Sequence, residues 1–474
     1  MTSITTISRL LRPQLCVAVG LAAAVGIAAC SDPASSSSTS TTTSTSSDGS
    51  TSSSTSGSGG SGGATCEKAP PSGFTAVVAP TADGTLGLDT AMVADENDDP
   101  MIAYQWYEPG GDGDASSVYF TRWDRCVGAF TAPVKVDVVG PVSTNGPTRR
   151  VALAYDVATK KLALAYELVF KVAGYENNPD NGVFLQTSAD KGATWTGKLH
   201  VSDQKDGDGE QATGPVVAIS GGKIQIAYAQ ENRACCPIAD PGCSGCAGVW
   251  YLEGDGATFT RALVSDATGT IQVAGSTLSI AVDSAGKPAL AFLQAPDKGY
   301  TRTAIYWRPG TTPVKVMDSN GIQNDDPSIS LAFDGTKPRI AAHLVAVDSA
   351  PYDLRVASST DGVTWSAPVP LPRDGSQFTA LYQSLAIDAK GNAAVSAYIN
   401  GGGGDNTCGG PRIVRSSDFK TWAACGADAD KKYTDIGGKY VDTYFTHENK
   451  LTMAFYGTLG DSNAGRGVML WREP

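Results

Sequence analysis

One pattern recurs along most of this sequence, and it constrains the fold more than any other feature. A strand-like apolar run ends in a polar turn, and a second apolar run follows, usually ending in an aromatic residue. The copies lie roughly 50 to 65 residues apart, and such regular self-similarity predicts an array of one supersecondary unit. The copies are Ala91–Asp95 with Met101–Tyr104, Val151–Asp156 with Leu162–Tyr166, Val216–Ile219 with Ile224–Tyr228, Leu278–Asp283 with Ala289–Phe292, Ile329–Asp334 with Arg339–Ala342, Leu385–Asp388 with Ala393–Tyr398, and Tyr440–Phe445 with Leu451–Tyr456.

Each unit continues with two more strand-like runs, of which the third tends to carry aromatic residues, as in Val118–Phe120 and Ile305–Trp307. Units of four strands and this length predict the blades of a β-propeller. Alanine alternates with larger residues in the first two strands, which suits inner strands that are buried on both faces. We therefore expect an all-β, seven-bladed propeller, with six blades as the alternative.

The two ends of the repeated region predict how the ring closes. The seventh unit has a third strand, Gly467–Trp471, but no fourth strand before Pro474. An unused strand-like run, Phe74–Ala79, precedes the first unit. If this N-terminal run completes the last blade, the ring closes and no sheet edge is left open between the first and last blades.

Three of the turns that follow a third strand share a signature. Ser188–Trp195 reads S-x-D-x-G-x-T-W, Ser359–Trp365 is one residue shorter, and Ser416–Trp422 lacks the glycine. This signature resembles the Asp box of sialidases and other BNR-repeat propellers. An Asp accepts backbone N–H bonds in such a turn, and a Gly tolerates positive φ. We interpret these residues as architecture: Ser188, Asp190, Gly192, Trp195, Asp361, Gly362, Trp365, Asp418 and Trp422.

The resemblance to sialidases implies that the Asp boxes lie on the face opposite an active site. Sialidase chemistry needs three arginines for the substrate carboxylate, a Tyr–Glu nucleophile pair and an acidic proton donor. The family's early R-I-P motif is absent, and Lys337–Ile340 holds similar letters in another order. Since no catalytic set can be transferred, catalytic residues stay unassigned.

The N-terminus resembles the leader of a bacterial lipoprotein. Arg9 and Arg12 precede the apolar run Leu15–Ala29, which is shorter than the ~20 residues of a spanning helix. The run ends at Cys30, in a lipobox-like context that implies acylation of this cysteine, and Ser31 implies sorting to the outer membrane. Residues 32–64 are a low-complexity Ser/Thr/Gly tract with no apolar surface to bury, so disorder is expected. The expected domains are a signal peptide (1–29), a lipid-anchored tether (30–65) and the propeller (66–474).

An even number of cysteines follows Cys30, and in an exported chain this predicts disulfides. Cys66 with Cys126 would tie the start of the domain to its first repeat, and Cys408 with Cys425 is the other simple pair. Four cysteines in one loop suit either two local disulfides, which we favour, or a zinc site. These four are Cys235, Cys236, Cys243 and Cys246.

The loops between second and third strands and between units are long and polar, whereas the opposite turns are short. Loops on a rigid scaffold carry function, so we expect the ligand at this face. The candidate ligand-binding residues are Arg149, Arg150, Asp326 and Tyr382.

No cofactor is expected, although one loop offers the oxygen-rich side chains that calcium prefers. Asp206, Asp208 and Glu210 would be its ligands, and solvated turn residues are the favoured alternative. The histidines His200, His343 and His447 have no metal-binding spacing.

Charge limits the partners. The chain has a net charge of −12 and no basic run, which argues against nucleic acid and against an electrostatic grip on lipid. The acyl group alone would hold the protein to the membrane of the cell envelope. Three functions remain: a surface module that binds a glycan, peptide or partner protein, a sialidase-like glycosidase, and a structural envelope protein. We favour the first because the tether and stapled loops are present and a catalytic set is not.

Overall fold

The structure is a computed structural model of the chain, and its described residues form strands joined by turns. Within the described ranges there is no helix long and apolar enough to cross a membrane. The predictions for residues 1–65 lie outside these ranges. The described residues are 66–78, 86–107, 115–141, 151–168, 182–202, 211–231, 248–266, 278–294, 303–318, 328–344, 353–372, 378–401, 410–423, 439–457 and 467–474.

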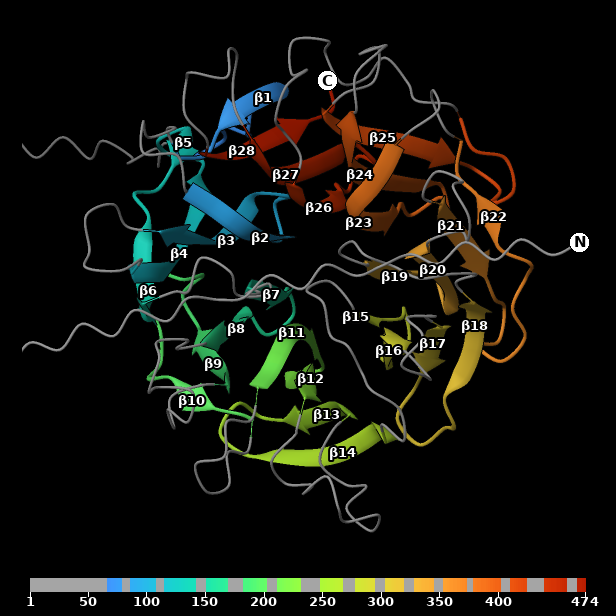
Figure 1. Ribbon diagram of the computed structural model, residues 1–474. Helices are drawn as coiled ribbons and strands as arrows, with labels where there is room; N and C mark the ends of the chain where they lie inside the picture. Colours follow the sequence, from blue (N-terminus) through green and yellow to red (C-terminus); the bar gives the residue numbers. More distant parts are fainter. Residues whose placement is uncertain are drawn as a thin grey trace, which may run out of the picture. The chain divides into compact units, whose positions relative to one another are not determined.

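The strands form seven antiparallel sheets arranged as blades around a central axis (Figure 1). The seven-bladed propeller is therefore confirmed, and the six-bladed alternative is wrong. Blade 1 contains β2 (Leu86–Ala94), β3 (Pro100–Tyr107), β4 (Ala115–Asp124), β5 (Ala129–Phe130) and β6 (Val134–Pro141); blade 2 contains β7 (Val151–Asp156), β8 (Lys161–Leu168), β9 (Gly182–Ser188) and β10 (Leu199–His200); blade 3 contains β11 (Gln211–Ser220), β12 (Lys223–Glu231), β13 (Gly248–Gly254) and β14 (Phe259–Asp266).

The remaining blades follow the same order from the axis outward. Blade 4 contains β15 (Leu278–Val282), β16 (Pro288–Gln294), β17 (Thr303–Trp307) and β18 (Val314–Asp318); blade 5 contains β19 (Ile329–Asp334), β20 (Lys337–Leu344), β21 (Asp353–Ser358) and β22 (Val369–Pro370); blade 6, in its described part, contains β23 (Phe378–Ile387), β24 (Ala393–Gly401) and β25 (Gly410–Ser416); blade 7 contains β26 (Lys439–Phe445), β27 (Leu451–Gly457), β28 (Gly467–Arg472) and β1 (Gly73–Ala76).

The ring closes through the N-terminal strand, as the sequence predicted. β1 pairs antiparallel with β28 and becomes the outer strand of blade 7, with Gly73 opposite Arg472 and Ala76 opposite Met469. Phe74 packs edge-on against Phe455, with ring centroids 6.1 Å apart. The first and last parts of the chain therefore share one blade, and neither leaves an open edge there.

The hydrophobic core is divided among the interfaces between neighbouring blades. Each hydrophobic cluster draws its buried side chains from two adjacent blades, as in the cluster that joins Phe120 and Val118 of blade 1 to Leu164 and Tyr166 of blade 2. Alanines of the second strands, such as Ala165, are fully buried. Their small side chains let neighbouring sheets approach closely, which is the physical reason for the alternation in the sequence.

The three Asp boxes form matching turns directly after the third strands of blades 2, 5 and 6. In the box of blade 2, Asp190 accepts hydrogen bonds from the backbone N–H of Thr194 (2.9 Å) and from its hydroxyl (2.6 Å). Hydrogen bonds from Thr194 and Ser188 lower the pKa of Asp190 to about 2. Bonds from turn N–H groups, led by those of Thr364 and Thr421, lower the pKa of Asp361 and Asp418 to about 2 as well. Turn donors thus occupy these carboxylates, in agreement with an architectural role.

The missing glycine of the third box is explained by the preceding blade. Gly192 and Gly362 have positive φ (+82° and +76°) and face aromatic rings of the blade before them, Phe120 and Tyr306. At the same position of the third box, Phe419 also has positive φ, 58°. Here the preceding blade offers the smaller Val356, and the Phe419 ring packs in the same cluster as that residue. The box therefore carries a small residue where its neighbour is large and a large residue where its neighbour is small.

Candidate functional site

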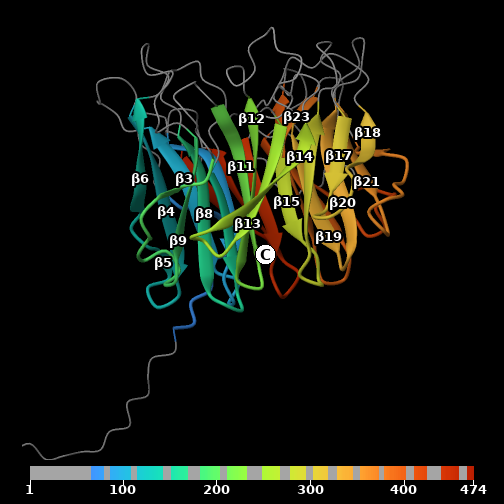
Figure 2. The same cartoon turned by 90° about the horizontal axis from the view of Figure 1, so that it is seen from below.

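A cavity of about 310 Å³ lies at the centre of the ring, and all seven inner strands line it. Its lining residues belong to the first halves of β15, β19 and β26 and to corresponding positions of the other inner strands. The chain enters each inner strand at this end, after the connection from the preceding blade. The Asp boxes and the short hairpin turns lie at the other end, and Figure 2 shows the propeller from the side. The cavity is thus at the face where the sequence predicted a ligand.

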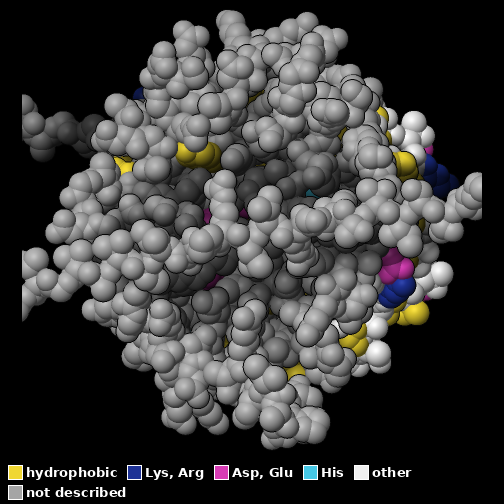
Figure 3. Space-filling model, in the orientation of Figure 1, with side chains coloured by type: hydrophobic (Ala, Val, Ile, Leu, Met, Phe, Trp, Pro, Cys, Tyr) yellow, Lys and Arg dark blue, Asp and Glu magenta, His cyan; other side chains and the backbone are white. Residues whose placement is uncertain are grey.

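The lining of the cavity has a polar and an apolar sector. Blades 5 to 7 and blade 1 contribute most of the polar groups, and blades 2 to 4 contribute mainly apolar ones. In the polar sector the polar residues are Asp89, Thr90, Ser330, Gln383, Ser384 and Asp442, beside the apolar Ala91, Met92, Ile329 and Val441. In the apolar sector Ser279 is the one polar lining residue described, beside Val151, Ala152, Leu153, Pro215, Val216, Val217, Leu278 and Ile280. In Figure 3 small areas of acidic side chains are visible near the middle of this face.

Polar side chains of the cavity lining also join neighbouring blades. An inner strand is the edge of its sheet, so some of its N–H groups need partners outside the sheet. Ser279, Ser330 and Asp442 occupy the same position in three blades, and each accepts a hydrogen bond from the inner strand of the next blade. The donors are Leu331 N (2.9 Å), Leu385 N (2.9 Å) and Met92 N (2.8 Å).

Asp442 is the acidic member of this set. Its carboxylate accepts hydrogen bonds from the N–H groups of Met92 and Thr443, both at 2.8 Å, and from the Ser384 hydroxyl at 3.5 Å. Desolvation outweighs these bonds and raises the pKa of Asp442 to about 6. The protonated form is therefore more favourable here than in water.

Replacing Asp442 with Asn is expected to flatten the pH dependence of stability. Because the pKa of Asp442 is raised above its ordinary value of 3.8, this group stabilises the fold at low pH and loses that contribution as the pH rises through about 6. The contribution lost amounts to about 3 kcal/mol at most. Chemical denaturation at pH 4.5 and pH 7.5 measures about 2 kcal/mol of it, since the first part of the loss occurs between pH 3.8 and pH 4.5. A wild-type-like pH dependence in the Asn variant would show that other groups produce the effect.

Asp89 brings a second carboxyl group to the same cavity. It is 7% exposed and lies in β2 with φ of 55°, a conformation uncommon for a residue other than glycine. Asp89 and Asp442 are the only charged side chains among the described residues that line the cavity. This part of the lining is suited to hydroxyl groups and other hydrogen-bond donors.

The residues that the sequence singled out for ligand binding are largely outside the described ranges. This is true of Arg149, Arg150 and Asp326, of the lipidation residue Cys30, and of the calcium-loop residues Asp206, Asp208 and Glu210. The same holds for Cys235, Cys236, Cys243, Cys246, Cys408 and Cys425. Tyr382 lies in β23 beside the cavity residue Gln383, and the structure does not describe its side chain.

Sequence reasoning missed Asp442, Asp89 and Gln383 as cavity residues. A signal for Asp442 was present, because it stands where three other repeats have serine, at Ser279, Ser330 and Ser384. Aligning the repeats position by position would have separated it from the turn-forming acids.

The groups that a sialidase needs are not assembled in the described part of the cavity. The described residues include the Tyr–Glu pairs Tyr155 with Glu96 (3.0 Å) and Tyr251 with Glu253 (3.1 Å), and neither pair lines the cavity. Burial, followed by the nearby carboxylates, raises the pKa of both tyrosines, which disfavours the phenolate. Arg339 is buried at the hairpin-turn end, where it donates to the Ser359 carbonyl at 2.6 Å. Among the described residues, no group of three or more His, Cys, Asp or Glu side chains could hold a metal ion.

No protein-family model and no curated protein matches this sequence. Solved structures with a similar fold include an Aleuria aurantia lectin (12% identity, TM-score 0.42, 72% of this chain and 96% of that one). They also include an α-L-arabinofuranosidase from Fusarium graminearum (8%, 0.46, 84% and 97%) and a Streptococcus pneumoniae sialidase (12%, 0.42, 84% and 70%). At these identities the likeness concerns the fold alone.

Proposed function

We propose that this protein is an exported, lipid-anchored module of the outer membrane that binds a glycan in its central cavity. The observation that carries the proposal is the two-sided lining of that cavity. Sugars present hydroxyl groups along their edges and C–H groups on their ring faces. A polar sector of carboxylate, amide and hydroxyl groups opposite an apolar sector matches both, and the cavity volume is within the usual range for small-ligand sites.

The charge of the described lining favours a neutral glycan over an acidic one. Asp89 and Asp442 can accept hydrogen bonds from hydroxyl groups. A hydrogen bond to a carboxylate is stronger than one between two neutral groups. A sialoside would bring a carboxylate toward two carboxyl groups. We therefore expect neutral glycans to bind more tightly than sialosides.

The test is a binding screen of oxidised protein, residues 31–474, on an array of neutral and sialylated glycans, followed by calorimetry. Ala152→Phe should fill the apolar sector and weaken binding at least tenfold, without removing a hydrogen-bonding group. Ala158→Phe is the matched control, because Ala158 is exposed in the hairpin turn at the other end of the propeller. Equal binding by the two variants, or no binding by the wild type, would contradict the proposal.

A glycosidase is the second candidate, and one observation favours it. Glycosidases use a carboxylic acid with a raised pKa beside a second carboxylate, and Asp442 and Asp89 line one cavity. In this mechanism Asp442 protonates the leaving oxygen as its bond to the anomeric carbon breaks, and Asp89 takes a proton from the water that attacks that carbon. Fluorogenic neutral glycosides test it: Asp442→Asn should lower kcat by 100-fold or more. Turnover that survives this substitution would remove Asp442 from the mechanism.

A further inference from the structure

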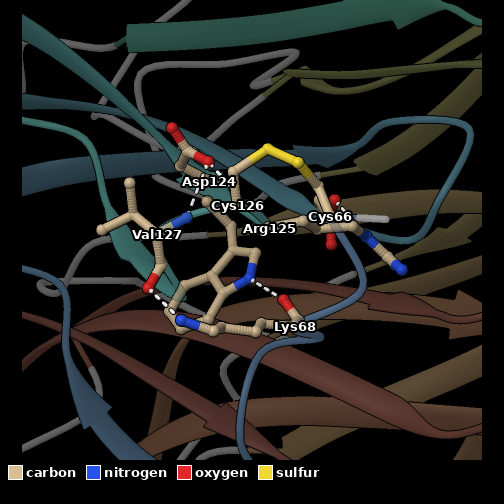
Figure 4. Close-up of a disulfide and its surroundings, with 8 residues drawn as sticks. Cys66, Lys68, Asp124, Arg125, Cys126 and Val127 are labelled. Carbon is tan, nitrogen blue, oxygen red and sulfur yellow. Dashed lines mark hydrogen bonds and ion pairs between the residues drawn. A yellow bond between two sulfur atoms is a disulfide. The ribbon is translucent and has the colours of Figure 1, made fainter. Parts of the chain in front are cut away.

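The N-terminal end of the described chain is fastened to a turn of blade 1. Cys66 forms a disulfide with Cys126, which lies between β4 and β5 (Figure 4). This is the pairing that the sequence suggested. The two cysteines are 60 residues apart, and the segment between them contains β1 and the three inner strands of blade 1. The bond therefore joins the segment that precedes β1, the closing strand of blade 7, to blade 1.

Hydrogen bonds around Lys68 extend this attachment. Its backbone N–H donates to the Arg125 carbonyl (3.2 Å), and its carbonyl accepts a bond from the Trp123 indole (2.7 Å). The Lys68 ammonium donates to the Val127 carbonyl at 3.1 Å. Gly128 has φ of +76°, and a Cβ there would lie 2.6 Å from the Lys68 side chain, so the turn fits closely against this segment.

The turn is itself held in place. The Asp124 carboxylate accepts bonds from the N–H groups of Cys126 (2.8 Å) and Val127 (3.2 Å). Arg125 forms an ion pair with Asp99 of the first hairpin at 2.6 Å. The turn that carries Cys126 is thus attached to β4 and to the hairpin between β2 and β3, and a pull on Cys126 is shared between them.

The closing strand, by contrast, is short. β1 pairs with β28 over four residues, all of them half-buried, and it begins seven residues after Cys66. A pull on the N-terminal segment would load its hydrogen bonds one after another, beginning at Gly73. Bonds that break in sequence resist force poorly, since each contributes only about 0.5–1.5 kcal/mol. Loss of β1 would leave blade 7 without its outer strand.

We propose that the Cys66–Cys126 disulfide is a mechanical clasp that transfers tension from the N-terminal segment into blade 1. A covalent link keeps Cys66 beside the turn, so tension applied before residue 66 reaches Cys126 before it can separate β1 from β28. Residues 30–65, predicted to be an anchored tether, are the segment that would apply such tension. The clasp lets the ring stay closed while the protein is held at its N-terminus.

The disulfide and the cavity lie at opposite ends of the propeller. Cys126 lies in a turn at the Asp-box end, and the cavity opens at the opposite end of the propeller. In Figure 2 the described N-terminal residues, in blue, leave the propeller at its lower end. Among the described residues, the N-terminal segment therefore begins at the end of the propeller opposite the proposed ligand cavity.

Single-molecule pulling on residues 31–474 tests the clasp. Force is applied between the N-terminus of the predicted tether and a bio-orthogonal handle at exposed Thr312 in blade 4. The oxidised protein should show no step before the ring unfolds. The double variant Cys66→Ser/Cys126→Ser should show an early low-force step with a length gain on the order of 50 Å, the reach of the stretch from Glu67 to β2.

Identical force–extension curves for the two proteins, or an early step in both, would overturn the proposal. The variant Val127→Ser keeps the disulfide and replaces an exposed side chain of the same turn, so it should behave as the wild type. If the double variant does not fold, reductant is added to folded wild-type protein in the trap, and the same early step is expected. No ligand enters this experiment, so its outcome is independent of the glycan screen.

Discussion

Replacing Gly192 with alanine is expected to destabilise the propeller by about 3 kcal/mol. Two costs combine at this position. The backbone has φ of +82°, where an L-residue with a Cβ costs about 1–2 kcal/mol. The new Cβ would also lie 2.1 Å from a ring carbon of Phe120 in the preceding blade, and overpacking of this kind costs about 1–3 kcal/mol. Urea denaturation of the two proteins measures the difference.

Gly310→Ala is the matched control. Gly310 has nearly the same φ, +80°, and a Cβ added there would meet no other atom within 4 Å. This variant should lose only about 1 kcal/mol, the backbone cost alone. Equal losses at the two glycines would show that contact with Phe120 is unimportant. The double variant Gly192→Ala/Phe120→Ala should be more stable than the sum of the single effects predicts, since removing the ring makes room for the methyl group.

At position 419 we expect glycine to be less destabilising than alanine, which is the reverse of the usual order. Phe419→Ala removes a ring that is 8% exposed, packs near Trp422 and lies under the Arg339 guanidinium at 4.5 Å. We expect a loss of about 3 kcal/mol, the lower end for a buried Phe→Ala change. Phe419→Gly creates the same cavity but relieves the positive φ of 58°, so it should be about 1 kcal/mol less harmful.

Thermal unfolding of both variants beside the wild type checks this order. At most positions glycine is the more destabilising of the two, because it loses more conformational freedom on folding. An alanine variant more stable than the glycine variant would mean that the backbone strain at Phe419 is negligible. Either way, the comparison separates the ring's contribution from that of the backbone.

The two variants examine one rule of this propeller, that the Asp-box residue at the position of Gly192, Gly362 and Phe419 complements the blade before it. The sequence alone showed a missing glycine in the third box and offered no reason. The reason lies at a distance of one blade, where Val356 stands in the place of Phe120 and Tyr306. A local motif thus departs from its pattern because a remote residue is smaller.

The candidate site was predictable in position but not in composition. Long polar connections at one end of the repeat indicated the face, and the cavity lies there. Asp442 and Asp89 were not recognised, because an acidic residue near the start of an inner strand looks like many acidic residues in turns. Only the convergence of seven strands brings Asp442 into one lining with Gln383, which is 59 positions earlier in the chain.

The sequence by itself determined the repeat, the number of blades, the Asp-box turns and the closure by an N-terminal strand. These features follow from local signals, namely the alternation of small and large apolar residues, turn residues, and the fixed spacing of copies. The tertiary structure alone decided which side chains meet across the axis and which residue fits against which blade. The physical reason is that hydrogen bonds and packing between blades join residues about 60 positions apart, and a linear pattern does not record those distances.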